Sequence, residues 1–237
     1  MTRAVVIIPT YNEKENVERM AQAVMALPVA IDILFVDDNS PDGTAAIIRE
    51  LITQFPGRIF LEERQGKLGL GTAYIHGFKW SLNQNYDYIF EMDCDFSHNP
   101  LDLPRLLEAC TKKGADVSIG SRYTRGGKVQ NWPMGRILMS YFASVYVRMI
   151  LFIGISDTTA GFMCYSSKVL RAIDLDNIHF KGYAFQIEMK YAAKKKGFKI
   201  LEVPITFIDR QFGESKMSSS IFKEAFFGVW KMRNLKV

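Results

Sequence analysis

Two aspartates, Asp93 and Asp95, follow an apolar run in the segment YIFEMDCDFSHNP, which spans residues 88–100. Residues 88–92 are mostly apolar, aromatic or β-branched, which is typical of a strand covered on both faces. Residues i and i+2 of an extended chain point to the same side, so the two carboxylates should share a small volume and repel each other. A divalent cation would offset that repulsion, so the spacing predicts a metal site.

The same segment also fits a purely structural interpretation. An aspartate after a strand often starts a turn or caps the next helix, and Asn99-Pro100 followed by Asp102 gives that signal. A calcium loop of the EF-hand type is excluded, because its sixth position is His98 instead of glycine and its twelfth is Pro104 instead of glutamate. The cap and the metal site both stay open at this point.

The composition limits the classes of partner. The 237 residues are 48% hydrophobic, which is enough to bury the core of one α/β domain. A net charge of +5 and a pI near 9.0 favour anionic partners such as phosphorylated small molecules or an anionic membrane surface. No basic tail or RNA-binding signature favours nucleic acid. Three cysteines (Cys94, Cys110 and Cys164) lack metal-ligand spacing and no signal peptide is evident, so we expect a cytoplasmic protein.

Strands and helices alternate along the first half of the chain. AVVIIPTYNE predicts a strand ending near Pro9, and Asn12 with Glu15 predicts a capping box for a helix to about Ala26. Further expected elements are a strand ending at residue 36, a helix over 44–54, a strand over 58–63, the glycine-rich loop RQGKLGLG and a helix over 72–82. This alternation predicts an α/β fold with a mostly parallel central sheet.

Three polar loops, PTYNE, VDDNS and DCDFS, follow three of the expected strands. Because ligands bind at the carboxyl ends of the strands in such sheets, we expect these loops to converge on one site. The glycine-rich loop lacks the Gly-x-Gly-x-x-Gly pattern, and Lys67 is not followed by serine or threonine. A nicotinamide enzyme and a P-loop ATPase are therefore disfavoured.

The three loops in this order resemble the nucleotide-sugar-binding half of family 2 glycosyltransferases, which have the Rossmann-like GT-A fold. RQGKLGLGTAY, GSRYTRGG, WPMGR and DRQFGESKM are similar to the dolichyl-phosphate and polyprenyl-phosphate mannose synthases, so the resemblance covers nearly the whole chain. It implies a single GT-A domain over residues 1–237, with a nucleotide-sugar-binding half (1–120) and an acceptor-binding half with amphipathic helices (121–237). It further implies inverting transfer of a hexose, with GDP-mannose as the expected donor, to a polyprenyl (dolichyl-type) phosphate.

The resemblance also implies roles for individual residues. Those expected at the donor are Pro9, Tyr11, Glu13, Val36, Asp38, Asp93, Cys94, Asp95, Arg122, Arg210 and Lys216. Those expected at the acceptor phosphate are Arg122, Arg136 and Ser140. Asp95 and Ser97 are the expected ligands of Mg²⁺ or Mn²⁺, and Asp95, Arg122, Arg210 and Lys216 the expected catalytic residues. A guanidinium group binds phosphate through two parallel hydrogen bonds, which suits arginine to this task.

The acceptor is already an anion, so no general base is needed. Glu188, in YAFQIEMKYAAKKK, is the nearest base candidate, and we interpret it as structural or donor-positioning.

The family commonly has Phe-Arg where this chain has Phe162-Met163. Alternatives that stay open are UDP-glucose or UDP-N-acetylglucosamine as donor, and a non-catalytic membrane-binding subunit.

Two segments are candidates for membrane contact. Residues 137–155 have the length of a membrane span, but Arg148 disfavours a spanning helix and favours a surface or core helix. SIFKEAFFGVWKMRNLKV, residues 220–237, predicts an amphipathic helix that lies at the membrane surface or packs on the domain. The chain resembles the short form of the family without transmembrane helices, so we expect peripheral association with the cytoplasmic membrane surface, with a small membrane subunit as a possible partner.

Overall fold

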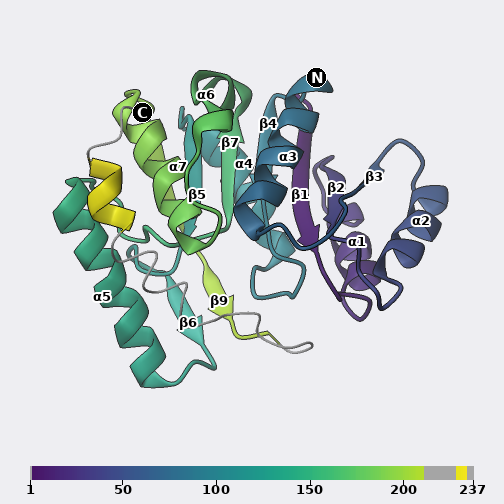
Figure 1. The fold of residues 1–237 in the computed structure, drawn as a ribbon, viewed down its shortest axis with the longest axis horizontal. Coiled ribbons are helices and arrows are strands. Elements are labelled where there is room, and N and C mark those ends of the chain that lie inside the picture. Colours follow the sequence, from purple (N-terminus) through teal and green to yellow (C-terminus); the bar gives the residue numbers. More distant parts are fainter. Residues whose placement is uncertain (1, 211–227, 234–237) are drawn as a thin grey trace.

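The structure is a computed structural model that describes residues 2–210 and 228–233 (Figure 1). The strands are β1 (Ala4–Thr10), β2 (Asp32–Asp37), β3 (Ile59–Glu63), β4 (Tyr88–Glu91), β5 (Val117–Ser121), β6 (Lys128–Gln130), β7 (Met163–Ser166), β8 (Ile200–Pro204) and β9 (Thr206–Ile208). The helices are α1 (Val17–Met25), α2 (Thr44–Gln54), α3 (Leu70–Asn83), α4 (Leu103–Thr111), α5 (Met134–Leu151), α6 (Ser167–Ala172) and α7 (Tyr183–Lys195), with 3₁₀ turns at Pro100–Asp102 and Leu175–Asn177.

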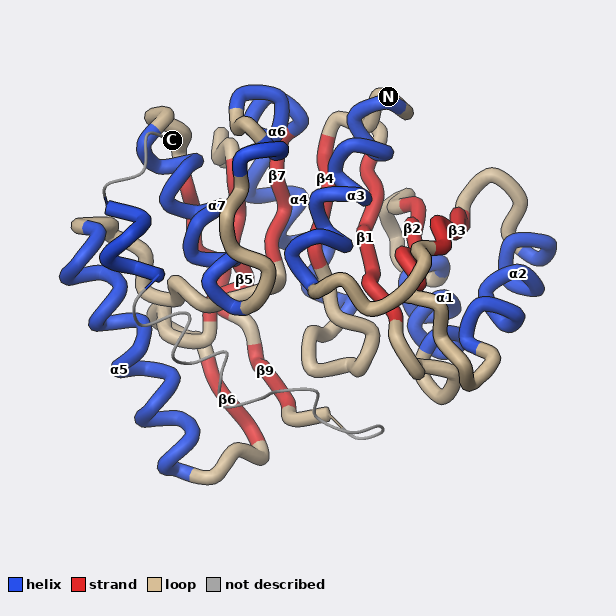
Figure 2. The backbone as a smooth tube through the Cα atoms, in the orientation of Figure 1, coloured by secondary structure: helices blue, strands red, loops and turns tan. Residues whose placement is uncertain are grey.

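Seven of the strands form one central sheet in the order β3-β2-β1-β4-β7-β5-β8 (Figure 2). All neighbouring pairs are parallel except those of β7, which runs antiparallel to both β4 and β5. β6 and β9 pair in a separate two-stranded parallel sheet next to α5. The expected mostly parallel α/β sheet is therefore confirmed. A division at residue 120 falls inside β5, so one sheet serves both halves of the chain.

The core lies on both faces of the central sheet. Val5 and Ile7 of β1 pack on the side of α3 and α7, whereas Val6 and Ile8 pack on the side of α1, α2 and α4. All four side chains are fully buried, as expected for parallel strands covered on both faces. Gly77 allows α3 to approach β1 closely, because a Cβ there would lie 2.7 Å from a methyl group of Ile7.

The expected elements of the first half are confirmed, apart from the start of α1. The helix predicted over residues 44–54 is α2, and the helix predicted from residue 72 begins two residues earlier as α3. The capping box of Asn12 and Glu15 was wrong, because α1 begins only after Asn16. Asn12 has a left-handed backbone (φ 55°), and its N–H donates to Ser40 Oγ at 3.0 Å. Asn12 therefore contacts the β2–α2 loop, and the turn before α1 is closed by the N–H groups of Asn16 and Val17 donating to the Glu13 carbonyl.

α5 is an exposed apolar helix. It has 18 residues with a mean hydropathy of 1.2, and by length and composition alone it is long and apolar enough to cross a membrane. Only 17% of it is buried, so it is not a core helix. Residues 228–233 form a helical segment with Val229 and Met232 buried and Trp230 half exposed. The rest of the predicted C-terminal amphipathic helix lies outside the described residues.

Candidate active site

Two adjoining cavities lie at the carboxyl ends of β1, β2 and β4. The smaller, of about 360 Å³, we call the donor cavity, and the larger, of about 490 Å³, the acceptor cavity. Both names state the roles that the sequence predicts for the residues lining them. The cavities share Leu70, Asp93, Asp95 and Arg210 in their walls. The paired aspartates therefore stand at the junction, where groups bound in the two cavities would meet.

The donor cavity brings together most of the residues expected at the nucleotide sugar: Pro9, Tyr11, Glu13, Asp38, Asp93, Cys94, Asp95 and Arg210. They converge because the carboxyl ends of parallel strands meet at one edge of the sheet. Two further residues expected at the donor do not line this cavity: the Val36 side chain is fully buried in the core, and Arg122 lines the acceptor cavity. Lys67 and Lys181 also line the donor cavity and were not predicted. Both add positive charge suited to phosphate.

The two aspartates that follow β2 have different surroundings. Asp37 accepts hydrogen bonds from Thr10 Oγ1 (2.8 Å) and from the backbone and hydroxyl of Ser40 (2.9 and 2.6 Å), so it holds two loops together. Asp38 lines the donor cavity and forms a buried ion pair with Arg64 at 2.6 Å. Burial raises the pKa of Asp38, and the Arg64 charge opposes that rise. Asp37 is structural, whereas contact of Asp38 with the base or ribose stays a prediction.

Asp93 and Asp95 give the junction an excess of negative charge. Asp95 is buried, and its Oδ1 accepts a hydrogen bond from the Ser97 N–H at 3.0 Å. Its Oδ2 lies 2.9 Å from the Arg210 guanidinium. The Asp93 side chain is 40% exposed; its partial enclosure, followed by the charge of Asp95, raises its pKa, and Arg210 opposes this rise. Two carboxylates this close together would both be stabilised in their charged form by a bound cation.

The cap signal is also confirmed, but it belongs to a different residue. Asn99 Oδ1 accepts a hydrogen bond from the Leu101 N–H at 3.0 Å and caps the 3₁₀ turn before α4. The turn interpretation also holds for Asp95, because its Oδ1 accepts the Ser97 N–H two residues further on. His98, which sequence reasoning did not assign to the site, is buried with its ring stacked on Phe162 at 5.0 Å between centroids. Burial lowers the pKa of His98 to about 4, and its Nδ1 accepts a hydrogen bond from the Asp93 N–H at 3.3 Å, so the ring is neutral near pH 7.

The junction fits a hard divalent cation. No group of three or more His, Cys, Asp or Glu side chains with metal-site geometry occurs among residues 2–210 and 228–233. Two aspartates and the Ser97 hydroxyl are nevertheless available as oxygen donors at the cavity wall. Mg²⁺ is typically held by one or two carboxylates, with substrate phosphates completing its coordination. The donor set and the excess negative charge thus match a cation that binds together with a diphosphate.

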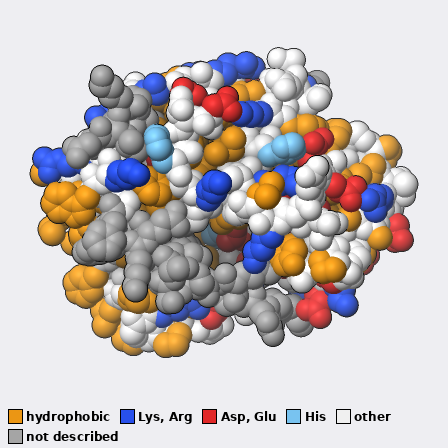
Figure 3. All heavy atoms as spheres, in the orientation of Figure 1, with side chains coloured by type: hydrophobic (Ala, Val, Ile, Leu, Met, Phe, Trp, Pro, Cys, Tyr) orange, Lys and Arg blue, Asp and Glu red, His pale blue; other side chains and the backbone are white. Residues whose placement is uncertain are grey.

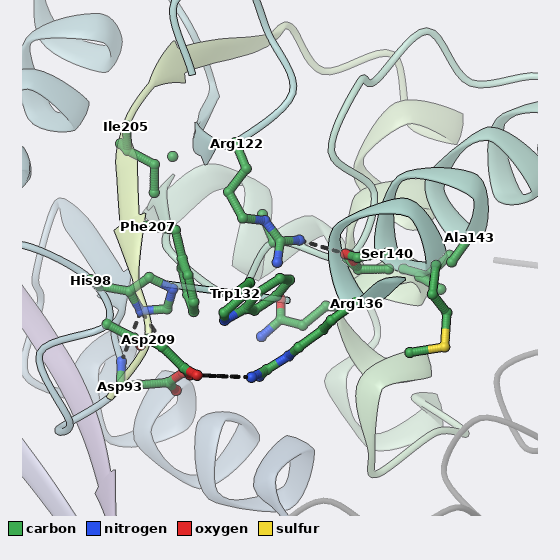
Figure 4. Close-up of a pocket in the computed structure, with 18 of the residues that line it drawn as sticks. Asp93, His98, Arg122, Trp132, Arg136, Ser140, Ala143, Ile205, Phe207 and Asp209 are labelled. Atoms are coloured by element: carbon green, nitrogen blue, oxygen red, sulfur yellow. Dashed lines mark hydrogen bonds and ion pairs between the residues drawn. The ribbon is translucent and has the colours of Figure 1, made fainter. Parts of the chain in front are cut away.

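The acceptor cavity contains all three residues expected at the acceptor phosphate: Arg122, Arg136 and Ser140 (Figure 4). Arg122 follows β5 and forms a two-bond ion pair with the fully buried Asp157, at 2.7 Å for each bond. Burial alone would raise the pKa of Asp157, but the charge and hydrogen bonds of Arg122 lower it. The Arg122 guanidinium is therefore fixed in place at the cavity wall.

Arg136, on the first turn of α5, is held by two residues that were not predicted. Its Nη1 lies 3.2 Å from the carboxylate of Asp209, and its guanidinium carbon lies 3.9 Å from the ring centroid of Trp132. Figure 4 shows Trp132 between Arg122 and Arg136. The partners Asp157 and Asp209 are 35 and 73 positions away from their arginines, so no local spacing could reveal them. Trp132 stands in WPMGR, which the resemblance had singled out.

Glu188 has a structural environment. Its buried carboxylate accepts hydrogen bonds from the backbone N–H groups of His179 and Phe180, each at 3.0 Å, and it lines neither cavity. Met163, where the family has arginine, is fully buried in β7, so this departure falls in the core. Lys216 lies outside the described residues, and its expected role stays a prediction.

Comparison with known proteins identifies the class. Residues 5–174 match the family described as Glycosyl transferase family 2, and the chain belongs to this family and is a glycosyltransferase. It is 48% identical over 233 residues to the polyprenol monophosphomannose synthase of Mycolicibacterium smegmatis, covering 98% of this chain and 88% of that protein. It is 46% identical over 227 residues to the undecaprenyl-phosphate mannosyltransferase of Micrococcus luteus, covering 96% and 92%.

A solved structure supports the fold. The glucosyl-3-phosphoglycerate synthase of Mycobacterium tuberculosis, crystallised with Mn²⁺, uridine diphosphate and phosphoglyceric acid, superimposes with a TM-score of 0.74 at 14% sequence identity. The match covers 100% of this chain and 80% of that one. At this identity the likeness concerns the fold alone, and it confirms the GT-A-like architecture.

Proposed function

We propose that this protein transfers mannose from GDP-mannose to the phosphate of a membrane polyprenol, with inversion at the anomeric carbon. The observation that carries the proposal is the mixed lining of the acceptor cavity. Its charged lining residues are Asp93, Asp95, Arg122, Arg136 and Arg210. Its apolar lining includes Met139, Phe142, Ala143, Tyr146 and Val147 of α5, together with Val229. An amphiphile with a phosphate head and a hydrocarbon tail matches both kinds of lining, and the named activities of the two relatives agree.

The reaction then needs positioning more than proton transfer. The polyprenyl phosphate oxygen attacks the anomeric carbon, the bond to the nucleoside diphosphate breaks, and the diphosphate leaves as an anion. Arg122 and Arg136, with Ser140 beside them, would hold the acceptor phosphate, while Arg210 and Lys216 would bind the departing diphosphate. Fixed positive groups aimed at the charge that develops in the transition state are the main source of acceleration in such a site.

Mg²⁺ or Mn²⁺ is the proposed cofactor. Asp95 and Ser97, with Asp93 beside them, would hold the ion, which would neutralise charge on the leaving nucleoside diphosphate. The Mn²⁺ in the structure of the M. tuberculosis transferase supports the choice of a divalent cation. Arg210 contacts Asp95 at 2.9 Å, so it lies next to the place where the diphosphate and the ion would meet.

We also propose that α5 rests on the cytoplasmic face of the membrane. Met139 and Phe142 line the acceptor cavity and are also 50% and 61% exposed, so α5 carries apolar side chains that belong both to the cavity wall and to the surface. Leu138, Met149 and Phe152 add to the exposed apolar face, and hydrophobic side chains gather at that side of the molecule in Figure 3. A prenyl tail could leave the cavity there into a bilayer.

The test is transfer of labelled mannose from GDP-mannose to a polyprenyl phosphate in detergent, with Mn²⁺ or Mg²⁺ and with a chelator. We expect lipid-extractable product only when metal is present. UDP-glucose and UDP-N-acetylglucosamine, assayed in parallel, decide the donor. Transfer from either in preference to GDP-mannose would replace the proposed donor, and no transfer from any of the three would favour a non-catalytic membrane-binding role.

A further inference from the structure

We propose that Gln186 binds hydroxyl groups of the donor hexose and so determines which sugar the enzyme accepts. This inference rests on the proposed function, because it concerns the sugar of the nucleotide donor. Gln186 lies on the first turn of α7 and was not among the residues that the sequence singled out. Its side chain lines the acceptor cavity together with Ala160 and Gly161 of the loop before β7.

The position of the hexose follows from the two cavities. The nucleotide belongs in the donor cavity, and its diphosphate belongs at the junction formed by Asp93, Asp95 and Arg210. The acceptor phosphate belongs near Arg122 and Arg136. Because the transferred sugar must stand between the leaving and the attacking phosphates, it must enter the acceptor cavity just beyond the junction. Gln186 is one of the polar side chains in that cavity.

The Gln186 amide has hydrogen-bonding capacity that the described protein does not use. The residue is 2% exposed, and neither Nε2 nor Oε1 has a partner at full hydrogen-bond geometry among the described residues. The amide lies close enough to the Glu91 carboxylate to lower the pKa of that group, but a contact there uses only one N–H and leaves Oε1 and the second N–H available. A buried polar group without a partner is costly and uncommon, and one that lines a cavity points to a ligand. An amide offers two donor hydrogens and one acceptor oxygen. Neighbouring sugar hydroxyls, each both a donor and an acceptor, are its natural complement.

The surroundings of Gln186 hold it rigidly and leave its amide accessible. The buried Lys190, one turn along α7, donates to the Ala160 carbonyl at 2.6 Å and to the Gln186 carbonyl at 3.1 Å. These two hydrogen bonds hold α7 against the loop at residues 160–161. A Cβ at Gly161 would lie 3.6 Å from Gln186 Nε2, so the glycine leaves the amide less covered. A group held by a rigid scaffold selects among ligands better than a mobile one.

A structural role for Gln186 has to be separated from this one. Glu91, the last residue of β4, is fully buried, and its carboxylate oxygens also have no hydrogen-bond partner among the described residues. Burial raises the pKa of Glu91, and the nearby Gln186 amide and Lys190 ammonium oppose the rise. If Gln186 served mainly to stabilise Glu91, its loss would weaken the fold and affect all ligands alike.

The experiment compares wild type with Gln186→Met, which keeps the side-chain volume but removes the amide. Gln22→Met, at an exposed glutamine of α1, controls for the substitution itself. Affinities for GDP and for GDP-mannose are measured by calorimetry, and the melting temperature of the ligand-free protein is recorded. We expect unchanged GDP affinity, about tenfold weaker GDP-mannose binding, and a melting temperature equal to or above that of wild type.

Deoxy analogues of GDP-mannose supply a second measurement that does not depend on the stability of a variant. For the wild-type protein, removing the hydroxyl that Gln186 binds should reduce kcat/KM about tenfold. For Gln186→Met, the same analogue should have the same kcat/KM as GDP-mannose itself. Equal losses in the two proteins for every deoxy analogue would overturn the proposal. A lower melting temperature with GDP and GDP-mannose weakened equally would assign Gln186 to Glu91 instead. A wild-type protein that transfers no sugar at all would overturn the proposed function, and this inference with it.

Discussion

The Arg122–Asp157 pair offers the sharpest test of how the site is held, through the substitution Asp157→Asn. The Arg122 side chain is 9% exposed and that of Asp157 is 0% exposed, and two hydrogen bonds of 2.7 Å join them. The neutral amide keeps the shape of the side chain but removes the carboxylate charge that faces the buried guanidinium. At a separation of about 4 Å and an effective dielectric constant of about 20, the lost attraction is about 4 kcal/mol. This agrees with the roughly 3–5 kcal/mol measured when one partner of a buried pair is removed.

The assay is urea unfolding followed by tryptophan fluorescence, with transfer activity measured on the folded variant. We expect the free energy of unfolding to fall by about 3–5 kcal/mol at pH 7. Arg122 lowers the pKa of Asp157, so the carboxylate stabilises the fold above the unfolded pKa of about 3.9 and ceases to do so as the pH falls through the lower folded pKa. The difference between the variant and wild type should therefore shrink below about pH 4.

The double variant Arg122→Met, Asp157→Leu separates the structural role from the chemical one. Replacing both partners by apolar groups leaves no buried charge, so stability should largely return. Activity should not return, because the double variant lacks the guanidinium proposed to hold phosphate. A single variant Asp157→Asn within about 1 kcal/mol of wild type would refute the reasoning, since it would mean that Arg122 does not depend on this carboxylate.

Four further predictions follow from the same contacts. Asp95→Ala should abolish metal-dependent transfer while the far-ultraviolet circular dichroism stays unchanged; normal turnover with Mn²⁺ would remove Asp95 from the metal site. Arg210→Ala should slow saturated turnover by about one to two decades, for a charge-assisted contact of about 1.5–3 kcal/mol, and activity equal to wild type would exclude the contact. Burial raises the pKa of Glu91 from 4.5 to about 8, so the free energy of unfolding of the wild type should fall as the pH rises through that interval. In urea unfolding, the free energy of unfolding of Glu91→Gln should depend less on pH over the same interval. Leu138→Glu with Met149→Glu, both exposed on α5, should prevent sedimentation with anionic liposomes and leave transfer to a detergent-soluble acceptor intact; unchanged sedimentation would exclude α5 as the contact.

The sequence by itself determined the elements and the place where the loops converge. Runs such as AVVII and ILFV are short, rich in β-branched residues and alternate with helical segments, which predicts strands of a parallel sheet covered on both faces. Once the strands are parallel, the residues at their ends must meet at one edge. This is why the loops that contain Asp38 and Asp95 and the loop after Pro9 could be placed at one site before any contact was known, whereas the roles of the individual residues came from the resemblance. The cap at Asn99 was predictable for a different reason, because a turn signal depends only on neighbouring residues in the chain.

Only the tertiary structure decided how each charged group is used. The local sequence does not predict that β7 lies antiparallel between β4 and β5, because strand order results from the packing of the whole sheet. Asp37 and Asp38 look alike in the sequence, yet one holds loops and the other faces a cavity. Arg122 meets Asp157 across 35 positions. Local patterns determine which way a side chain points from its own strand or helix. The residue that it contacts on another element is determined only when the whole sheet has packed.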